Sequence, residues 1–310
     1  MLSRLAALFR RHVQLATVPQ ARQIERTLLL QAQQMVEHRR QIAYMHGSVL
    51  TSIKDAEFSV FSQWGEDGIL DWLVSNIPGI PHVAVEFGCS DYQEATTRLL
   101  VQLRNWKAVL VDASVESCAA ICSSPLMWQY DLTVLQRTLT PSMLAAFCNT
   151  HIPKEIGVLS LDVDGMDYWL LTALPVKPVV LVCEYNALFG NTDPITVPLT
   201  DNFDRRTAHW THLYFGASLP AIATAAQRQG YTWIGTESHG CNAFFVRHDY
   251  AQRILDKLDQ IIPHEAQFRE GRDVNGQLAY SRERRPIAHL PVWNVQTNQT
   301  VRVQEADCRW

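Results

Sequence analysis

Four short apolar runs, each with an acidic residue at or near its end, constrain the fold of this chain more than any other feature. They are VAVEFG (83–88), AVLVDA (108–113), GVLSLDVDG (157–165) and VVLVCEYN (179–186). Near-continuous apolar runs of this length are typical of parallel strands that are buried on both faces of a sheet. Segments with helical spacing alternate with them, at roughly 92–103, 115–122, 141–149 and 167–173. The alternation predicts an α/β fold with a doubly wound, mostly parallel, Rossmann-like sheet, whose working crevice lies at the carboxyl ends of its strands.

A weaker strand and a terminal hairpin complete the predicted sheet. The weaker strand is expected from Met127 to Tyr130, between the second and third helical segments. YTWIGTES (231–238) and NAFFVR (242–247) are strands with only His239, Gly240 and Cys241 between them. So short a connection forces an antiparallel pair, which a plain dinucleotide-binding domain does not need.

The chain divides into three predicted regions. These are a basic helical arm at 1–50, a catalytic domain at 58–258, and a polar extension at 259–310 that ends in a small β hairpin formed by PVWNV (291–295) and TVRVQ (300–304). Within the arm, mostly apolar residues recur at a seven-residue spacing from Ile24 to Met45. Three interpretations of the arm are open: a dimerising helix that makes the protein a homo-oligomer, an amphipathic helix packed on the body, or a peripheral contact with an anionic membrane surface.

Composition excludes several classes of protein. The 310 residues are 47% hydrophobic and 19% charged, which is typical of globular chains and unlike collagen-like, disordered or disulfide-scaffold proteins. Seven scattered cysteines without a CxxC pair suit a reducing compartment. No apolar run approaches the ~18–20 residues of a transmembrane helix, and Leu5 to Phe9 is too short for a secretory signal, so we expect a soluble, cytoplasmic protein. Residues 1–46 hold seven arginines against two glutamates within a chain of net charge −4; the remainder is acidic, which argues against a nucleic-acid partner.

Residues after successive strands favour an adenosine-containing ligand. Gly88 allows a cofactor to approach the backbone closely, and Glu86 is placed to bind an ammonium or ribose group, although a tight turn with a surface acid is the alternative. Asp112 ends the second strand, where an acid can accept hydrogen bonds from the two hydroxyls of a ribose. Asp131, after the weak third strand, can reach an adenine amino group. The turn lacks the GxGxxG spacing of dinucleotide binders, which argues against hydride transfer.

The densest group of acids is DVDGMD (162–167), followed one strand later by Glu184-Tyr185-Asn186. Acids at the ends of neighbouring strands repel one another unless a cation joins them, and oxygen ligands suit Mg²⁺ or Mn²⁺. The predicted metal ligands are Asp162, Asp164, Glu184 and Asn186. In the alternative interpretation, one acid binds the ammonium group of the cofactor and the others cap helices, as Asp167 can do at the start of the next helix.

Further candidates are expected around the mouth of the crevice. SQWGEDGIL (62–70) opens a helix before the first strand, so that Gln63 and Asp67 can contact a ligand. His239, in the hairpin turn, is a candidate general base, with a solvated turn histidine as the alternative. Tyr185 and Asn242 are candidate substrate contacts at the same edge.

The ordered motifs SQWGEDGIL, VEFGCSD, VLVDAS, LSLDVDGMDYW, CEYNALFG, YFGASL and GCNAFFVR resemble the FkbM-like S-adenosylmethionine-dependent methyltransferases, in a branch associated with bacterial glycan clusters. The resemblance covers roughly residues 58–250 and implies a class I methyltransferase fold of seven strands, the last antiparallel. It implies that Glu86, Gly88 and Ser90 form the cofactor turn, with Ser90 replacing the third position of the usual glycine-rich pattern. It further implies roles for three aspartates: ribose for Asp112, adenine for Asp131, and the methionine portion with its methyl group for Asp162. The acids of the fourth and fifth strands are similar to the divalent-metal site of catechol-type O-methyltransferases.

The leading hypothesis is therefore methyl transfer from S-adenosylmethionine to a hydroxyl of a sugar in a bacterial surface glycan or its precursor, catalysed by Asp162 with His239 as second base. Two alternatives remain. A metal-dependent glycosyltransferase can use the DxD pattern at 162–164, and a catalytically inactive methyltransferase fold can serve as an assembly module.

Overall fold

The computed structural model describes residues 18–46, 49–266 and 271–309. The chain divides into two compact units, 1–47 and 48–310. In the first unit, α2 (Val18–His46) is a helix of 29 residues with a proline in its first turn, where the missing N–H costs nothing. Of the seven-residue repeat in the arm, Ile24, Met35 and Ile42 are exposed. Self-association through this helix remains a prediction, and the arginines before residue 18 lie outside the described residues.

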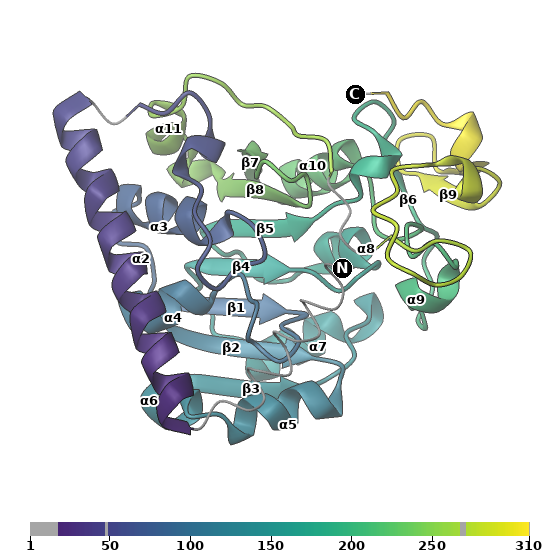
Figure 1. Cartoon of the computed structure of the whole chain (residues 1–310). Coiled ribbons are helices and arrows are strands. Elements are labelled where there is room, and N and C mark those ends of the chain that lie inside the picture. The colour runs from purple at the N-terminus through teal and green to yellow at the C-terminus, as the bar shows by residue number, and fades with distance from the viewer. Residues whose placement is uncertain (1–17, 47–48, 267–270, 310) are drawn as a thin grey trace. The chain divides into compact units, whose positions relative to one another are not determined.

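Within the described residues of the second unit, seven strands form one sheet in the order β3-β2-β1-β4-β5-β8-β7 (Figure 1). The strands are β1 (Val83–Phe87), β2 (Lys107–Asp112), β3 (Leu132–Gln136), β4 (Val158–Leu161), β5 (Val180–Glu184), β7 (Tyr231–Thr236) and β8 (Asn242–Arg247). Neighbouring strands are parallel, except that β8 is antiparallel to both β5 and β7. The strand order and the antiparallel last strand confirm the predicted class I methyltransferase arrangement.

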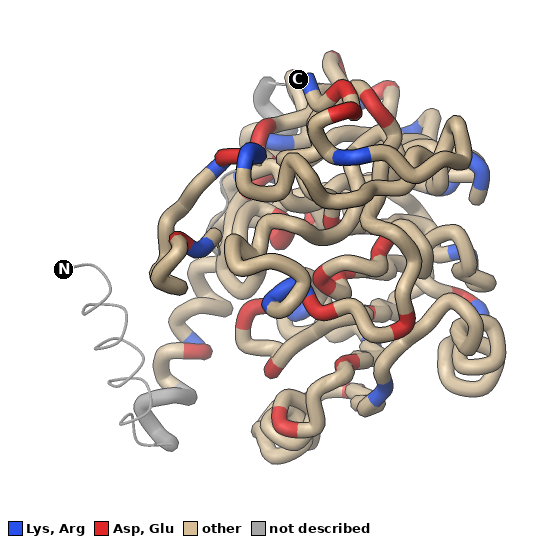
Figure 2. The backbone as a smooth tube through the Cα atoms, turned by 90° about the vertical axis from the view of Figure 1, so that its right-hand side faces the viewer, with Lys and Arg blue, Asp and Glu red and all other residues tan. Residues whose placement is uncertain are grey.

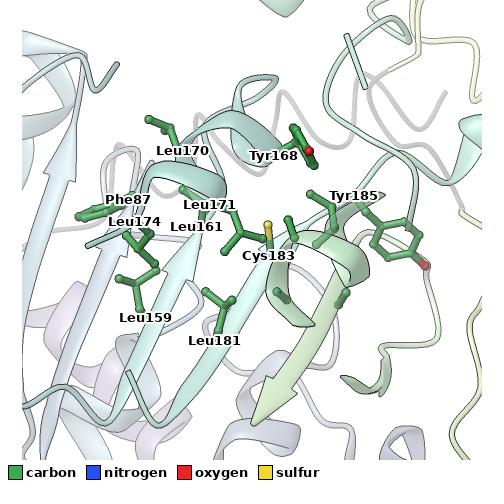
Figure 3. Packing of buried hydrophobic residues seen from close by; sticks show 14 of the residues in the cluster. Phe87, Leu159, Leu161, Tyr168, Leu170, Leu171, Leu174, Leu181, Cys183 and Tyr185 are labelled. Carbon is green, nitrogen blue, oxygen red and sulfur yellow. The ribbon is translucent and has the colours of Figure 1, made fainter. Parts of the chain in front are cut away.

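Helices cover both faces of this sheet, because each face buries its own apolar cluster. One cluster joins the sheet to α7 (Pro141–His151), α8 (Asp167–Ala173) and α10 (Leu219–Arg228). Figure 3 shows part of it, where Leu159 and Leu181 of the sheet lie near Leu171 and Leu174. The other cluster joins the opposite face to residues of α3 (Glu66–Asn76), α4 (Arg98–Arg104), α5 (Val115–Ser123), α6 (Leu126–Gln129) and α11 (His248–Leu255). The protein is therefore doubly wound, as predicted.

The third strand lies later in the chain than the sequence analysis placed it. Residues 126–129 form α6, with Pro125 at its N-cap, and β3 begins at Leu132, which pairs with Ala108 of β2. The prediction of a strand at Met127–Tyr130 is therefore wrong. Proline favours the start of a helix, whereas LTVLQ has the alternation and β-branched residues of a strand.

A second, three-stranded sheet has the order β10-β9-β6. β9 (Pro291–Asn294) and β10 (Gln299–Arg302) form the predicted C-terminal hairpin, and β9 also pairs with β6 (Ile195–Thr196), in the segment between β5 and α10. Figure 1 shows β6, β9 and α9 (Arg205–Ala208) beyond the arrowheads of the large sheet. The segment after β5 and the C-terminal extension thus fold together at the carboxyl edge. Among the described helices, none combines the length and apolarity needed to cross a bilayer.

Candidate functional site at the carboxyl edge of the sheet

The turn after β1 is shaped by the close approach of two loops. Gly88 has a φ of +84°, a conformation that favours glycine. A Cβ on Gly88 would overlap the carbonyl group of Asp162, directly after β4. Glycine is therefore required here both by backbone conformation and by space, and the end of β1 lies against the end of β4.

Glu86 is buried beneath this turn. Its carboxylate accepts hydrogen bonds from the backbone N–H of Thr96 at 2.8 Å, from that of Thr97 at 3.0 Å and from the Thr97 hydroxyl at 2.5 Å. Burial raises the pKa of Glu86, and these hydrogen bonds oppose the shift. Because Thr97 is the N-cap of α4, Glu86 fixes the start of that helix. This explains why α4 begins at Arg98 rather than near residue 92.

Asp112 joins the loops that follow β1 and β2. One carboxylate oxygen accepts the Ser90 N–H at 2.7 Å and the other accepts the Ser114 N–H at 2.8 Å. Ser90 has a φ of +49°, a conformation that the tight turn requires and that serine adopts less readily than glycine. Each carboxylate oxygen keeps a second lone pair, so Asp112 can still accept hydrogen bonds from a ligand.

The corrected position of β3 removes Asp131 from this group. Asp131 precedes β3 instead of following it, so it lies at the opposite edge of the sheet, beside the start of β2. Its carboxylate pairs with the Lys107 ammonium at 2.8 Å on the surface. The assignment of Asp131 to an adenine amino group is therefore wrong.

Three carboxylates meet where β4 and β5 end, and we call Asp162, Asp164 and Glu184 the carboxylate cluster. One oxygen from each lies within 4.8 Å of the others. Burial raises the pKa of Asp162 and of Glu184 well above their ordinary values, and the neighbouring carboxylates raise both further. Figure 2 looks onto this edge and shows acidic positions gathered there. Carboxylates this close are stable only where a shared proton or a nearby positive group offsets their repulsion.

Arg205 of α9 places a positive group beside the cluster. Its Nη1 lies 2.9 Å from a carboxylate oxygen of Asp164 and 3.8 Å from one of Glu184. Its Nε donates to the backbone oxygen of His212 at 2.8 Å, and its guanidinium lies over the ring of Phe215, 3.7 Å from the centroid. The sequence analysis missed this residue. Its only sequence signal was an arginine pair after Asp204, which caps the short helix.

Asp167 and Asn186 serve the backbone around the cluster. The Asp167 carboxylate accepts the N–H groups of Val163 and Gly165, both at 2.9 Å, in agreement with the helix-start alternative. The fully buried Asn186 amide donates to the backbone oxygens of Leu213 and Phe215 at 3.0 and 2.9 Å and accepts the Leu188 N–H at 3.0 Å. The Asn186 amide is thus held by the backbone on both its nitrogen and its oxygen, and its role as a metal ligand remains a prediction.

Two predicted substrate contacts also have structural roles. Asp67 is buried, and one of its oxygens accepts three backbone N–H groups, of Val60, Phe61 and Ser62, at 2.7, 2.6 and 3.0 Å. The Tyr185 ring lies in the apolar core (Figure 3), and its hydroxyl donates to the backbone oxygen of His264 at 2.8 Å. The Tyr185 side chain is thus used within the core, which corrects its assignment to the substrate. The other oxygen of Asp67 is buried and has no hydrogen-bond partner among the described residues, so its contact with a ligand remains a prediction. Gln63 lies in the partly exposed loop before α3, and its contact with substrate remains a prediction.

The hairpin between β7 and β8 is built around Glu237. Its buried carboxylate accepts the backbone N–H groups of the four residues at 239–242. Burial raises the pKa of Glu237 to about 8, and the carboxylate of Glu66 adds to the shift. Asn242 donates to Glu66 at 2.8 Å and pairs with Glu184 in the sheet register. Asn242 thus lies at the predicted edge, but its amide is used within the protein, and we no longer assign it to the substrate.

His239 occupies the exposed side of the same hairpin. Its ring stacks on Trp64, with centroids 3.9 Å apart and an interplanar angle of 10°. Burial lowers the pKa of His239, so the imidazole is neutral at neutral pH and able to accept a proton. Of the predicted residues, the structure thus brings Glu86, Gly88, Ser90, Asp112, Asp162, Asp164, Glu184 and His239 to the carboxyl edge.

No protein-family model matches this chain, and no curated protein matches it either. Solved structures similar to this chain include proteins named as methyltransferases. The N-terminal domain of EvdMO1 with SAH bound has a TM-score of 0.40 at 11% identity, over 68% of this chain and 95% of that one. A sarcosine dimethylglycine methyltransferase, described as putative, from Galdieria sulphuraria has a TM-score of 0.34 at 11% identity, over 64% and 75%. A methyltransferase from Mesorhizobium loti has a TM-score of 0.32 at 14% identity, over 59% and 100%.

Proposed function

We propose that this protein transfers a methyl group from S-adenosylmethionine to a hydroxyl, on a sugar of a bacterial surface glycan or its precursor. The observation that carries the proposal is the meeting of three strand ends at one place. Gly88 after β1 lies against Asp162 after β4, and Asp112 at the end of β2 binds the N–H of Ser90 in the same turn. In a doubly wound sheet, this crevice is where a nucleoside ligand binds. The motif resemblance supports the sugar acceptor.

The reaction requires alignment and the removal of one proton. A lone pair of the acceptor oxygen forms the new C–O bond, the electrons of the C–S bond return to sulfur, and the hydroxyl proton passes to a base. Proximity and general-base catalysis are the contributions that the protein makes to such a displacement. We assign the base to Asp162, which directly follows β4 and lies against the cofactor turn at Gly88, with the neutral His239 as the second candidate.

The expected Mg²⁺ or Mn²⁺ does not fit the residues as the structure arranges them. Three of the four predicted ligands converge, but the Asn186 amide is bonded to the backbone. The guanidinium of Arg205 already lies against Asp164 and Glu184. We therefore derive no step of the reaction through a metal.

Calorimetry with S-adenosylhomocysteine and with a UDP-sugar tests the proposal. Binding of S-adenosylhomocysteine alone is the expected result. Binding of the UDP-sugar alone would favour the glycosyltransferase alternative for the DxD at 162–164. Binding of neither compound would refute the proposed function and favour an assembly module.

A further inference from the structure

We propose that Arg205 is a positioning residue that supplies the positive charge of the carboxylate cluster, in the place that a divalent cation would otherwise take. The inference deepens the proposed function and rests on it for the role of the cluster in methyl transfer. It makes the site independent of metal, contrary to what the sequence predicted.

The anchoring of Arg205 carries the first step of the argument. The guanidinium is held by Asp164, by the backbone oxygen of His212 and by the face of the Phe215 ring, and the side chain is 10% exposed. A buried guanidinium is stable only when it is paired and its hydrogen bonds are made. These contacts, which come from different sides, fix the guanidinium against the carboxylate cluster. The guanidinium of a surface arginine is not held in this way.

The segment that carries these anchors is itself fixed. Asn186, directly after β5, binds the backbone oxygens of Leu213 and Phe215, which positions the ring beneath the guanidinium. The Tyr214 hydroxyl donates to the backbone oxygen of Pro291 in β9. Asn186, which the sequence analysis assigned as a metal ligand, thus helps to hold Arg205, the residue that we place where the metal would be.

The carboxylate side gives the second, independent observation. Arg205 faces Oε1 of Glu184, whereas Oε2 of the same carboxylate is buried and accepts no hydrogen bond from any described residue. Buried acceptors nearly always have a partner. Glu184 is therefore held on one oxygen by Arg205, and its other oxygen can pair only with a donor: the neighbouring Asp162 carboxyl when protonated, or an acceptor hydroxyl.

The test is the binding of Mn²⁺ to the full chain, followed by the electron paramagnetic resonance signal of free Mn²⁺. Wild type is expected to bind no Mn²⁺ in the cluster. Arg205→Gln removes the charge and should gain one site, with an affinity at least about tenfold above that of wild type. Arg205→Lys keeps the charge and should behave as wild type. Arg206→Gln is the matched control, because Arg206 is exposed and pairs with Asp204.

Each outcome of this experiment either supports or overturns the proposal. The site gained in Arg205→Gln must disappear in the double variant with Asp164→Asn, and a gain that survives it overturns the proposal. Three other results would also overturn it. Wild type could bind Mn²⁺ at a site that Asp164→Asn removes. Arg205→Gln could gain no Mn²⁺ site, or Arg205→Lys could gain one of equal affinity. If Arg205→Gln does not fold, the comparison of wild type with Asp164→Asn decides alone: no binding by wild type supports the proposal. S-adenosylhomocysteine binding by wild type is measured separately, and its absence refutes the proposed function without changing the metal result.

Discussion

Gly88 and Asp162 are in such close contact that a Cβ on the glycine would overlap the carbonyl group of the aspartate. The two residues follow β1 and β4, neighbouring strands in the middle of the sheet. The contact draws the cofactor turn and the carboxylate cluster together. Both halves of the proposed reaction therefore depend on one glycine.

Gly88→Ala is expected to lower the free energy of unfolding by roughly 3 kcal/mol or more, because the left-handed backbone costs about 1–2 kcal/mol and the overlap forces the loops apart. S-adenosylhomocysteine binding should be lost as well. Gly79→Ala is the control, since Gly79 also has a positive φ but nothing lies within 4 Å of its added Cβ. Denaturant titration of both variants measures the difference; equal losses would show that the contact with Asp162 has no energetic effect.

Asp112→Asn is expected to weaken S-adenosylhomocysteine binding about tenfold or more, because hydrogen bonds to a charged group contribute ~1.5–3 kcal/mol. Asp131→Asn provides the control from the opposite edge of the sheet and should bind as wild type. Calorimetry compares the two variants. An unchanged affinity in Asp112→Asn would rule out the ribose assignment.

Above about pH 8, where Glu237 is ionised, Glu237→Gln should destabilise the protein by about 2–4 kcal/mol. The NH₂ of the new amide would then face backbone N–H groups that now donate to a carboxylate oxygen. The exposed Glu283→Gln is the matched control. Thermal unfolding of the two variants gives the comparison. If Glu237→Gln were as stable as the control, the hairpin would not depend on this carboxylate.

Stability should fall as the pH rises from about 5 to about 8.5. The pKa of Glu237 is raised by burial from 4.5 to about 8, and that of Asp167 from 3.8 to about 6. Over this window the folded chain holds protons that the unfolded chain has released, so a rise in pH favours unfolding; below both ordinary values the effect vanishes. Denaturant titrations across the window should show the fall, and Glu237→Gln should reduce it. A stability that increased with pH would contradict these shifts.

The large sheet could be predicted because each buried parallel strand leaves an apolar run that is visible without the structure. The third strand was misplaced because Met127–Tyr130 is also apolar, and nothing in that run shows that Pro125 starts a helix there. Because the third strand was misplaced, the predicted position of Asp131 was wrong as well. A shift of a few residues moved an acid from one edge of the sheet to the other.

Residues of the site could be predicted only where they follow a strand, because the end of a strand determines the direction in which each side chain points. Glu184 and Tyr185 are neighbours on an extended backbone, so their side chains point to opposite faces, and the crevice receives only one of them. Arg205 could not be found in this way. It depends on how the irregular segment after β5 folds back, and that path has no periodicity in the sequence.

The pairing of β6 with β9 has a consequence for the order in which the protein is made. Backbone hydrogen bonds join Asn191 to Arg309, Asp193 to Asp307 and Val295 to Pro194, at 2.8, 2.9 and 2.9 Å. Residues 295–309, which pair with the segment that bears Arg205, are synthesised later than all the strands of the large sheet and leave the ribosome after them. The sheet can therefore form during translation, whereas the wall beside its acidic edge must wait until the hairpin has emerged.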